Sequence, residues 1–306
     1  MVEYIVRRLI QTVLTLFVLT LTVFFMVRLV PGDPARALLQ PGAPQDQVEA
    51  MRKLLHLSGP LYVQYATWVW RTVHGDLGMS IFHRQPVSEL IVQRLPRTIE
   101  LAAVAMVFSV VVGGALGLAA ALKPGSAVDY IVRVLSLVGF AMPSFWFAIM
   151  LILVFSVMWH VLPTSGYGAP KFFVLPVLTL GAQLVGVIAS MVSATVSEVM
   201  REEFVRTARA KGLRERVVVH RHVLKNAFIT LVTLLGLQLG GLLGGAVIVE
   251  TVFAWPGIGL LTIDAVNTRD YPLVQALALL AGVIFLGINL LVDLFYAVID
   301  PRIRIS

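Results

Sequence analysis

The sequence contains no cysteine and few charged residues. Of its 306 residues only 13% are Asp, Glu, Lys or Arg, whereas soluble domains carry about 25%. The lack of cysteine excludes disulfides, iron–sulfur clusters, thiol nucleophiles and cysteine zinc sites. The chain also lacks a Gly-Lys dipeptide and therefore a P-loop, so it cannot hydrolyse ATP by that chemistry.

Apolar residues dominate what is present. They make up 58% of the chain, and the mean hydropathy is +0.88. A chain this apolar would expose too much hydrophobic surface to water, so the bilayer must be its solvent. A spanning helix needs about 20 mostly apolar residues, and six stretches qualify. We predict an all-α polytopic membrane protein, a single domain over 1–306, with spans near 9–30, 99–122, 132–159, 174–198, 228–252 and 275–299.

The distribution of lysine and arginine predicts the orientation of these spans. The short loops on the side of the N-terminus carry 14 such residues, and those on the other side carry only Lys171 and Arg269. Because basic residues in short loops favour the cytoplasm, we predict that both termini are cytoplasmic. The net charge of +7 then reflects topology, and nucleic acid is not an expected partner.

The segment 31–98 is a polar insert on the outer side, too long for a simple connection. Apolar residues recur at helical spacing over 46–57 and again over 61–73. We expect two short amphipathic helices there, on the membrane surface or the rim of the bundle. A structural cap and a docking surface for a soluble partner are both open interpretations.

Glu250, Asn289 and Asp293 are polar residues within or near the ends of the predicted spans. An ionised carboxylate is costly in hydrocarbon, so the two acids must face protein or water. Asn289 and Asp293 are four residues apart and share a helix face. A structural hydrogen bond to a neighbouring helix is favoured for both acids, and a place on the translocation path is the functional alternative.

Small residues predict close helix packing in two of the spans. Pro143 also predicts a kink in the third span, because its ring removes a backbone hydrogen bond. The small residues are Gly113, Gly114 and Gly117 in the second span, and Gly236, Gly240 and Gly244, spaced by four, in the fifth.

The cytoplasmic segment 199–227 carries eight basic and three acidic residues. Met200, Phe204 and Ala208 recur every four residues and predict one apolar helical stripe. Gly212 suits the left-handed residue that ends a helix. The pattern predicts a helix, a glycine turn and a second helix. Attraction to anionic lipid explains the charge but not the break, whereas an apolar stripe with basic flanks suits a groove on another protein.

The run from Phe204 to Gly212, followed by Arg221-His222 and Asn226-Ala227, resembles the EAA loop of ABC-type importer permeases. Ala208 and Gly212 match the general pattern, in which three residues separate Glu-Ala-Ala from Gly, whereas Arg206-Thr207 replace its Glu-Ala. The form Arg-Thr-Ala-Arg-Ala-Lys-Gly is usual in the dipeptide/oligopeptide/nickel permease family, on the side that includes the dipeptide, oligopeptide and glutathione permeases.

Further motifs extend this resemblance over the whole chain and occur in the order of the family. They are Pro31-Gly32-Asp33-Pro34, Gly75-Asp76-Leu77-Gly78-Met79-Ser80, Phe253-Ala254-Trp255-Pro256-Gly257-Ile258-Gly259, Asp270-Tyr271-Pro272 and Asp300-Pro301-Arg302.

The resemblance implies a type I ABC importer fold and a transport subunit that is not itself an enzyme. It implies a bacterial inner-membrane importer of peptides or related small solutes, whose identity stays open. The implied partners, besides membrane lipid, are a second homologous permease in a heterodimer, two cytoplasmic ATPase subunits that hold ATP and Mg, and a periplasmic or lipid-anchored solute-binding protein. No cofactor or metal is expected in this chain. The implied ATPase-coupling residues, within 202–215, are Glu203, Phe204, Arg206, Thr207, Ala208, Arg209, Ala210, Lys211, Gly212 and Leu213.

Two other classes of protein are alternatives. An ion- or proton-coupled secondary transporter could use the membrane acids, but neither internal repeats nor broken mid-membrane helices are evident in the sequence. An intramembrane enzyme could use Ser144 and His160. Their separation of 16 residues, about 24 Å along a straight helix, is beyond hydrogen-bond reach.

Overall fold

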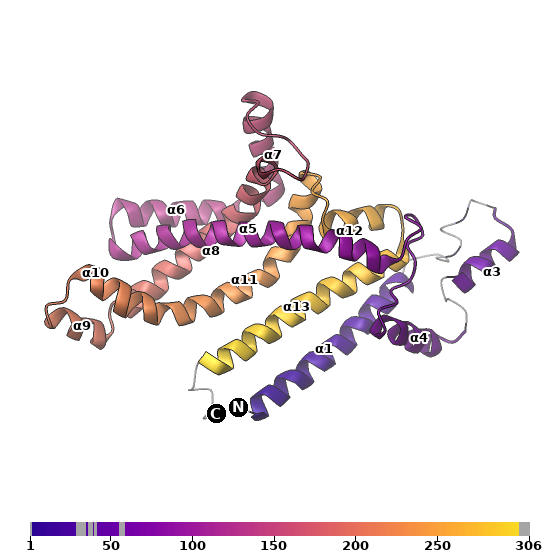
Figure 1. Ribbon diagram of the computed structural model, residues 1–306, viewed down its shortest axis with the longest axis horizontal. Coiled ribbons are helices and arrows are strands. Elements are labelled where there is room, and N and C mark those ends of the chain that lie inside the picture. Colours follow the sequence, from indigo (N-terminus) through magenta and orange to yellow (C-terminus); the bar gives the residue numbers. More distant parts are fainter. Residues whose placement is uncertain (1, 29–34, 36–38, 40–41, 55–58, 300–306) are drawn as a thin grey trace. The chain divides into compact units, whose positions relative to one another are not determined.

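The computed structural model describes residues 2–28, 35, 39, 42–54 and 59–299 (Figure 1). Every regular element in those ranges is a helix, which confirms the predicted all-α class. The motifs at 31–34 and 300–302 lie outside the described residues. Helix formation throughout is what a bilayer requires, because hydrocarbon offers the backbone no other hydrogen-bond partner.

Four helices within the described ranges are long and apolar enough to cross a membrane. They contain the predicted second, fourth and sixth spans and residues 9–28 of the predicted first span, whose last two residues lie outside the described ranges. A fifth helix, α11 (Leu224–Val252), covers the predicted fifth span. The number of spans and their orientation remain predictions. The four helices are α1 (Val2–Arg28), α5 (Val87–Leu122), α8 (Val174–Val199) and α13 (Tyr271–Ile299).

Helix α5 begins well before the predicted span at 99. Its first residue is Val87, so the end of the insert 31–98 is already helical. Pro96 lies inside this helix. The earlier part of the insert forms two short helices, α3 (Gln45–Leu54) and α4 (Leu61–Val73), which confirms the two helices expected there.

The predicted third span, 132–159, is not one kinked helix. Helix α6 (Ala127–Ala141) ends before Pro143, and α7 (Ser144–Leu151) follows, continued by the π-helix η1 (Ile152–Met158). The two parts are bent by 103°. Steric clash with a proline ring keeps the preceding residue out of the helical region. Met142 and Pro143 accordingly have extended ψ angles of 129° and 131°. The sequence therefore predicted the position of the bend but underestimated it.

The chain divides into two compact units. Of the described residues, the first unit comprises 98–256 and 291–299, and the second comprises those within 2–97 and 257–290. In the first unit α6 and α11 pack against α8. Its core gathers buried side chains such as Leu101, Leu180, Ile188, Val196 and Trp255.

The second unit has its own core and one further helix, α12 (Ile258–Asn267). Val87, Leu90, Leu261, Leu273 and Leu277 are among the buried residues of this core. A buried carboxylate ties two of the sequence motifs together: Asp270 accepts hydrogen bonds from the Ser80 hydroxyl at 2.5 Å and the Phe82 amide at 3.1 Å. The Gly75–Ser80 and Asp270–Pro272 motifs thus build one local structure.

Two of the three glycines of the second span lie against α8. A Cβ atom added to Gly117 would be 2.4 Å from the Ala189 carbonyl oxygen, and one added to Gly113 would be 2.8 Å from the Val185 carbonyl oxygen. Gly114 has no described atom within 4 Å of such a Cβ. The close packing predicted for this span therefore involves Gly113 and Gly117, which face the neighbouring helix.

The glycine stripe of the fifth span is not packed uniformly. A Cβ on Gly236 would be 2.6 Å from the Val292 side chain, whereas one on Gly244 would meet no described atom within 4 Å. A sequence period of four places residues on one face, but only the neighbouring helix decides how much of that face is covered.

Replacing Gly117 with alanine should destabilise the protein, because the new methyl group meets the backbone of α8. Overpacking of this kind costs about 1–3 kcal/mol. We expect a lower midpoint of thermal unfolding for Gly117→Ala in detergent, and no loss for the control Gly114→Ala. Equal unfolding midpoints for the two variants would show that α5 and α8 do not approach as closely as described.

Candidate functional site

The helix, glycine turn and helix predicted in the segment 199–227 are present. Helix α9 (Glu203–Ala210) follows α8 after a short turn. After Gly212 the chain forms α10 (Glu215–Val217) and the π-helix η3 (Val218–Val223), and then passes directly into α11. Figure 1 shows the α9–α10 hairpin at the end of the first unit where α8 finishes and α11 begins.

One face of α9 is anchored in the core of the first unit. Val205 and Ala208, one turn apart, are buried in the same cluster as Val218 and Val223 of η3. Phe204 is 41% exposed. The predicted stripe of Met200, Phe204 and Ala208 is therefore not one uniformly buried face, because Met200 precedes α9 and Phe204 is exposed while Ala208 is buried. Val205 was missed, although its three-residue spacing from Ala208 is also a helical signal.

The turn after α9 is a Schellman motif centred on Gly212. This glycine has φ +75°, as its predicted left-handed role requires. The Gly212 amide donates to the Arg209 carbonyl at 2.9 Å, and the Leu213 amide donates to the Ala208 carbonyl at 3.4 Å. These are the two bonds of the motif, and they satisfy carbonyl groups that the end of a helix leaves unpaired.

An ion pair joins α9 to α10. The Arg209 guanidinium donates to both oxygens of the Glu215 carboxylate, at 2.7 and 3.2 Å. These hydrogen bonds lower the pKa of Glu215 below its ordinary value, which favours the ionised carboxylate. Both side chains are largely exposed, and such pairs stabilise little. The pair links the side chains of α9 and α10 across the turn.

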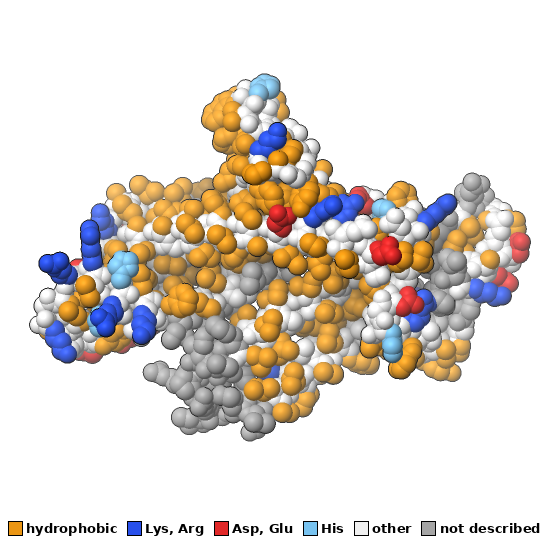
Figure 2. All heavy atoms as spheres, viewed as in Figure 1, with side chains coloured by type: hydrophobic (Ala, Val, Ile, Leu, Met, Phe, Trp, Pro, Cys, Tyr) orange, Lys and Arg blue, Asp and Glu red, His pale blue; other side chains and the backbone are white. Residues whose placement is uncertain are grey.

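The outward side of the hairpin presents apolar side chains among basic ones. We call it the α9–α10 surface and define it by Phe204, Leu213 and Val217 together with Arg206, Lys211, Arg214 and Arg216, all of which are exposed. Figure 2 shows lysine and arginine side chains gathered over this hairpin. The surface therefore combines an apolar contact area with positive charge.

The predicted coupling residues thus form one continuous structure with two sides. Ala208 faces the core, and the other nine are exposed. These nine are Glu203, Phe204, Arg206, Thr207, Arg209, Ala210, Lys211, Gly212 and Leu213.

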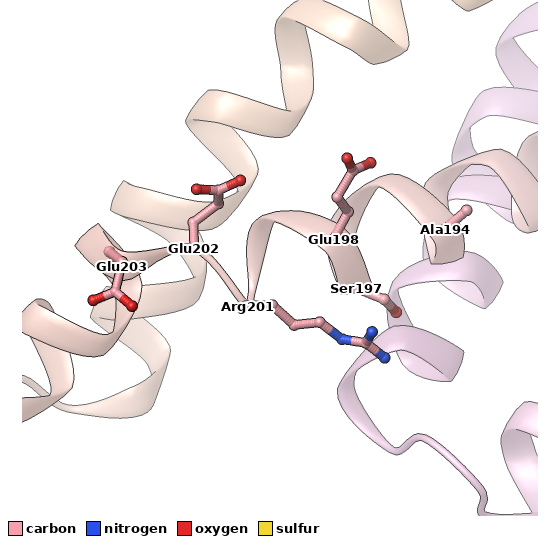
Figure 3. A pocket seen from close by; sticks show the side chains of 6 residues that line it. All are labelled: Ala194, Ser197, Glu198, Arg201, Glu202 and Glu203. Carbon is pink, nitrogen blue, oxygen red and sulfur yellow. The ribbon is translucent and has the colours of Figure 1, made fainter.

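An open pocket of about 440 Å³ lies where α8 ends and α9 begins. Figure 3 shows its lining, with the Glu198 and Glu202 carboxylates turned away from the Arg201 side chain. Three carboxylates against one guanidinium give the pocket a negative balance, in contrast to the adjoining surface. No group of three or more side chains with metal-binding geometry occurs among the described residues. The full lining is Ala194, Ser197, Glu198, Arg201, Glu202 and Glu203.

The polar residues of the predicted spans are placed differently from one another. Glu250 is completely buried, and its carboxylate accepts a hydrogen bond from the Thr98 hydroxyl at 2.6 Å. Asn289 and Asp293 are half-buried on α13. Thr98 was missed as a partner, since a single threonine in an apolar stretch gives no sign of where its hydroxyl points.

Comparison with known proteins identifies the class. Residues 113–305 match the family described as "binding-protein-dependent transport system inner membrane component", and residues 1–102 match the N-terminal membrane component of the same systems. The chain belongs to this family. It is a permease subunit of an ABC importer, and the alternative of a secondary transporter is wrong.

Particular relatives span the full length of the chain. It is 42% identical over 304 residues, 99% of both chains, to the glutathione transport system permease protein GsiC of Escherichia coli strain K12, and equally to that of Shigella dysenteriae serotype 1. Two solved structures share the fold: an amino acid ABC transporter crystallised with histidines (TM-score 0.54, 18% identity) and the methionine ABC transporter MetNI in inward-facing conformations (TM-score 0.55, 19% identity). Each match covers 69% of this chain, and 95% and 96% of the respective solved chain.

Gly212→Val should loosen the end of α9. A β-branched residue is strongly disfavoured at positive φ, and left-handed backbone costs about 1–2 kcal/mol in residues other than glycine. We expect trypsin to cleave the purified protein faster within 206–211. Gly212→Asn is the matched control, because asparagine tolerates this conformation. If both variants are cleaved at the rate of the parent protein, the turn does not hold α9.

Proposed function

We propose that the α9–α10 surface docks on a cytoplasmic ATPase and receives the motion that drives transport. The observation that carries this proposal is the division of α9 into an anchored and an uncovered side. Val205 and Ala208 hold the helix to its own unit, while Phe204 is exposed among basic residues. Short helices that present an apolar side chain in this way suit a groove on a partner.

The connections of α9 are suited to passing on a displacement. The Schellman turn and the Arg209–Glu215 pair tie α9 to α10. From Glu215 to Val252 the chain is helical without interruption, through η3 and α11. A movement of α9 is thereby conveyed to a long helix of the first unit, and through the buried contacts of Val205 to the core around α8.

The adjoining pocket can add specificity to this docking. Its excess of carboxylates suits a lysine or arginine of the partner, whereas the α9–α10 surface suits acidic side chains. Opposite charges on neighbouring patches would fix the register in which the two proteins meet.

The remaining parts of the importer follow from the family and from the missing P-loop. We propose that two separate ATPase subunits bind ATP and Mg and hydrolyse the ATP, so that this chain is not an enzyme. A second, homologous permease would complete a heterodimer, and a periplasmic or lipid-anchored binding protein would deliver the solute. The basic hairpin supports an inner-membrane orientation with both termini in the cytoplasm.

We further propose that the solute is a peptide or a related small molecule, with glutathione as the first candidate. The support is the full-length similarity to proteins named as glutathione transport system permeases. Selection can rest largely with the binding protein, so dipeptides, longer peptides and nickel chelates stay within the proposed class.

Placing a carboxylate at the exposed apolar position of α9 should uncouple transport. Phe204→Asp puts a charge into the proposed docking contact, and we expect loss of ATP-driven uptake with normal membrane insertion. Pro124→Asp introduces the same charge at an exposed loop position between α5 and α6 and serves as the control. Uptake in reconstituted vesicles and co-purification of the ATPase are the measurements.

Normal ATPase binding and normal uptake by the Phe204→Asp protein would contradict the coupling assignment. A defect shared by Pro124→Asp would point to a general effect of charge and would contradict it as well.

Uptake of labelled glutathione should depend on this permease and persist when an uncoupler removes the proton gradient. The expected result is accumulation in vesicles of the complete importer supplied with ATP, competed by an excess of unlabelled glutathione. A labelled dipeptide, tested in parallel, separates the members of the proposed solute class. Accumulation of neither compound would contradict the proposal.

A further inference from the structure

Helix α4 is attached to α1 by polar and aromatic contacts within the second unit. The hydroxyl groups of Tyr65 and Thr20 are hydrogen-bonded at 2.8 Å. The Tyr65 ring meets the Phe24 ring edge to face at 5.2 Å. Arg28 donates to the Gln64 side-chain oxygen at 2.8 Å, and Gln64 is buried. These contacts fix α4 beside the C-terminal end of α1 (Figure 1).

The level of these contacts places α4 at the edge of the bilayer. The stretch of α1 that is long and apolar enough to cross a membrane is Ile5–Met26. Thr20 lies six residues before its end, or about 9 Å at 1.5 Å per residue. Amphipathic helices in the membrane interface bury their apolar face by about 5–10 Å at the boundary between headgroups and acyl chains. The contact with Thr20 holds α4 at that depth.

Only part of the apolar surface of α4 is used against α1. Tyr62, Ala66, Trp70 and Val73 follow one another at intervals of four, four and three residues and form one stripe beside Tyr65. Tyr62, Trp70 and Val73 are 76%, 68% and 76% exposed. The stripe is therefore uncovered in this chain although it is apolar and aromatic.

The other side of α4 is polar and suited to water. Thr67 and Arg71 lie there, and Arg71 pairs with Asp76 at 2.8 Å. His74 follows Trp70 by one turn and its ring lies 4.3 Å from the Trp70 ring, at the border between the two sides. The apolar stripe is also continuous with the uncovered surface of α1, since the half-exposed Phe17 ring lies against Tyr65. Apolar residues on the side of the acyl chains and polar residues on the side of water are the arrangement of an interfacial helix.

We propose that α4 is a membrane-interface anchor whose stripe of Tyr62, Ala66, Trp70 and Val73 binds lipid in the leaflet at the C-terminal end of α1. Tyrosine and tryptophan suit this zone because their rings are apolar and their polar atoms reach the headgroups. A soluble partner could not cover the stripe without entering the headgroup layer. The anchor sets the depth of α1 in the bilayer and is independent of the proposed ATPase coupling.

The absence of cysteine permits a direct test on the full-length protein. Trp70→Cys and Val73→Cys, each labelled with an environment-sensitive fluorophore, are compared with Thr67→Cys on the polar side of the same helix. The proteins, purified with their partner subunits, are placed in vesicles of phosphatidylethanolamine and phosphatidylglycerol. We expect blue-shifted emission at 70 and 73 that brominated lipid quenches and iodide does not, and the reverse at 67.

Two results would overturn the proposal. Quenching by iodide at 70 and 73 as strong as at 67 would show that the stripe faces water. Protection from both quenchers would show that another protein subunit covers it. Because all three positions are exposed in the folded chain, labelling there leaves the folding of α4 undisturbed, and a circular dichroism spectrum of each variant checks this.

Discussion

The structure depends on one constraint: hydrocarbon provides no hydrogen-bond partner for a polar group. The backbone of every long apolar stretch described here is therefore helical, and several buried polar side chains are hydrogen-bonded within the protein, although the buried Ser156 hydroxyl has no hydrogen-bond partner among the described residues. Glu250 binds the Thr98 hydroxyl, and the buried Ser109 hydroxyl donates to the carbonyl oxygens of Ala105 and Gly181. Gly113 and Gly117 have no side chains, so α5 can approach the backbone of α8 closely at these positions. The two helices can therefore pack there without a polar side-chain contact.

The constraint also explains which features could be predicted from the sequence. Local rules gave the positions of α4, α8 and the glycine turn, because an apolar period, a span length and a left-handed glycine are properties of a short segment. The direction of a side chain relative to other helices is not such a property. Phe204 and Val205 are both apolar neighbours on α9, and only packing against η3 decides that Val205 is buried and Phe204 is not. The size of the bend at Pro143 likewise depends on where α6 and α7 find partners.

Resemblance to a family supplied what local rules could not. Composition and spacing alone would not suggest an ATPase as the partner proposed for the basic hairpin, and the motifs Gly75–Ser80 and Asp270–Pro272 have no meaning as isolated strings. The structure shows what these two motifs do physically: Ser80 of the first donates a short, buried hydrogen bond to Asp270 of the second, 190 residues further along the chain. Motifs far apart in the chain were therefore informative together, as one site, rather than singly.

The stability of α9 sets how a force can travel through the protein. A helix of eight residues is too short to be stable by itself in water, so α9 exists because Val205 and Ala208 are packed and because Gly212 and Arg209 fix its end. Its shape is thus a property of its contacts with the rest of the first unit. A partner that binds Phe204 cannot displace α9 independently of its neighbours. The displacement must either carry η3 and α11 along or break the packing that keeps α9 folded. The first course keeps the buried contacts and costs less free energy, and this supports the proposal that so small a helix acts as a lever.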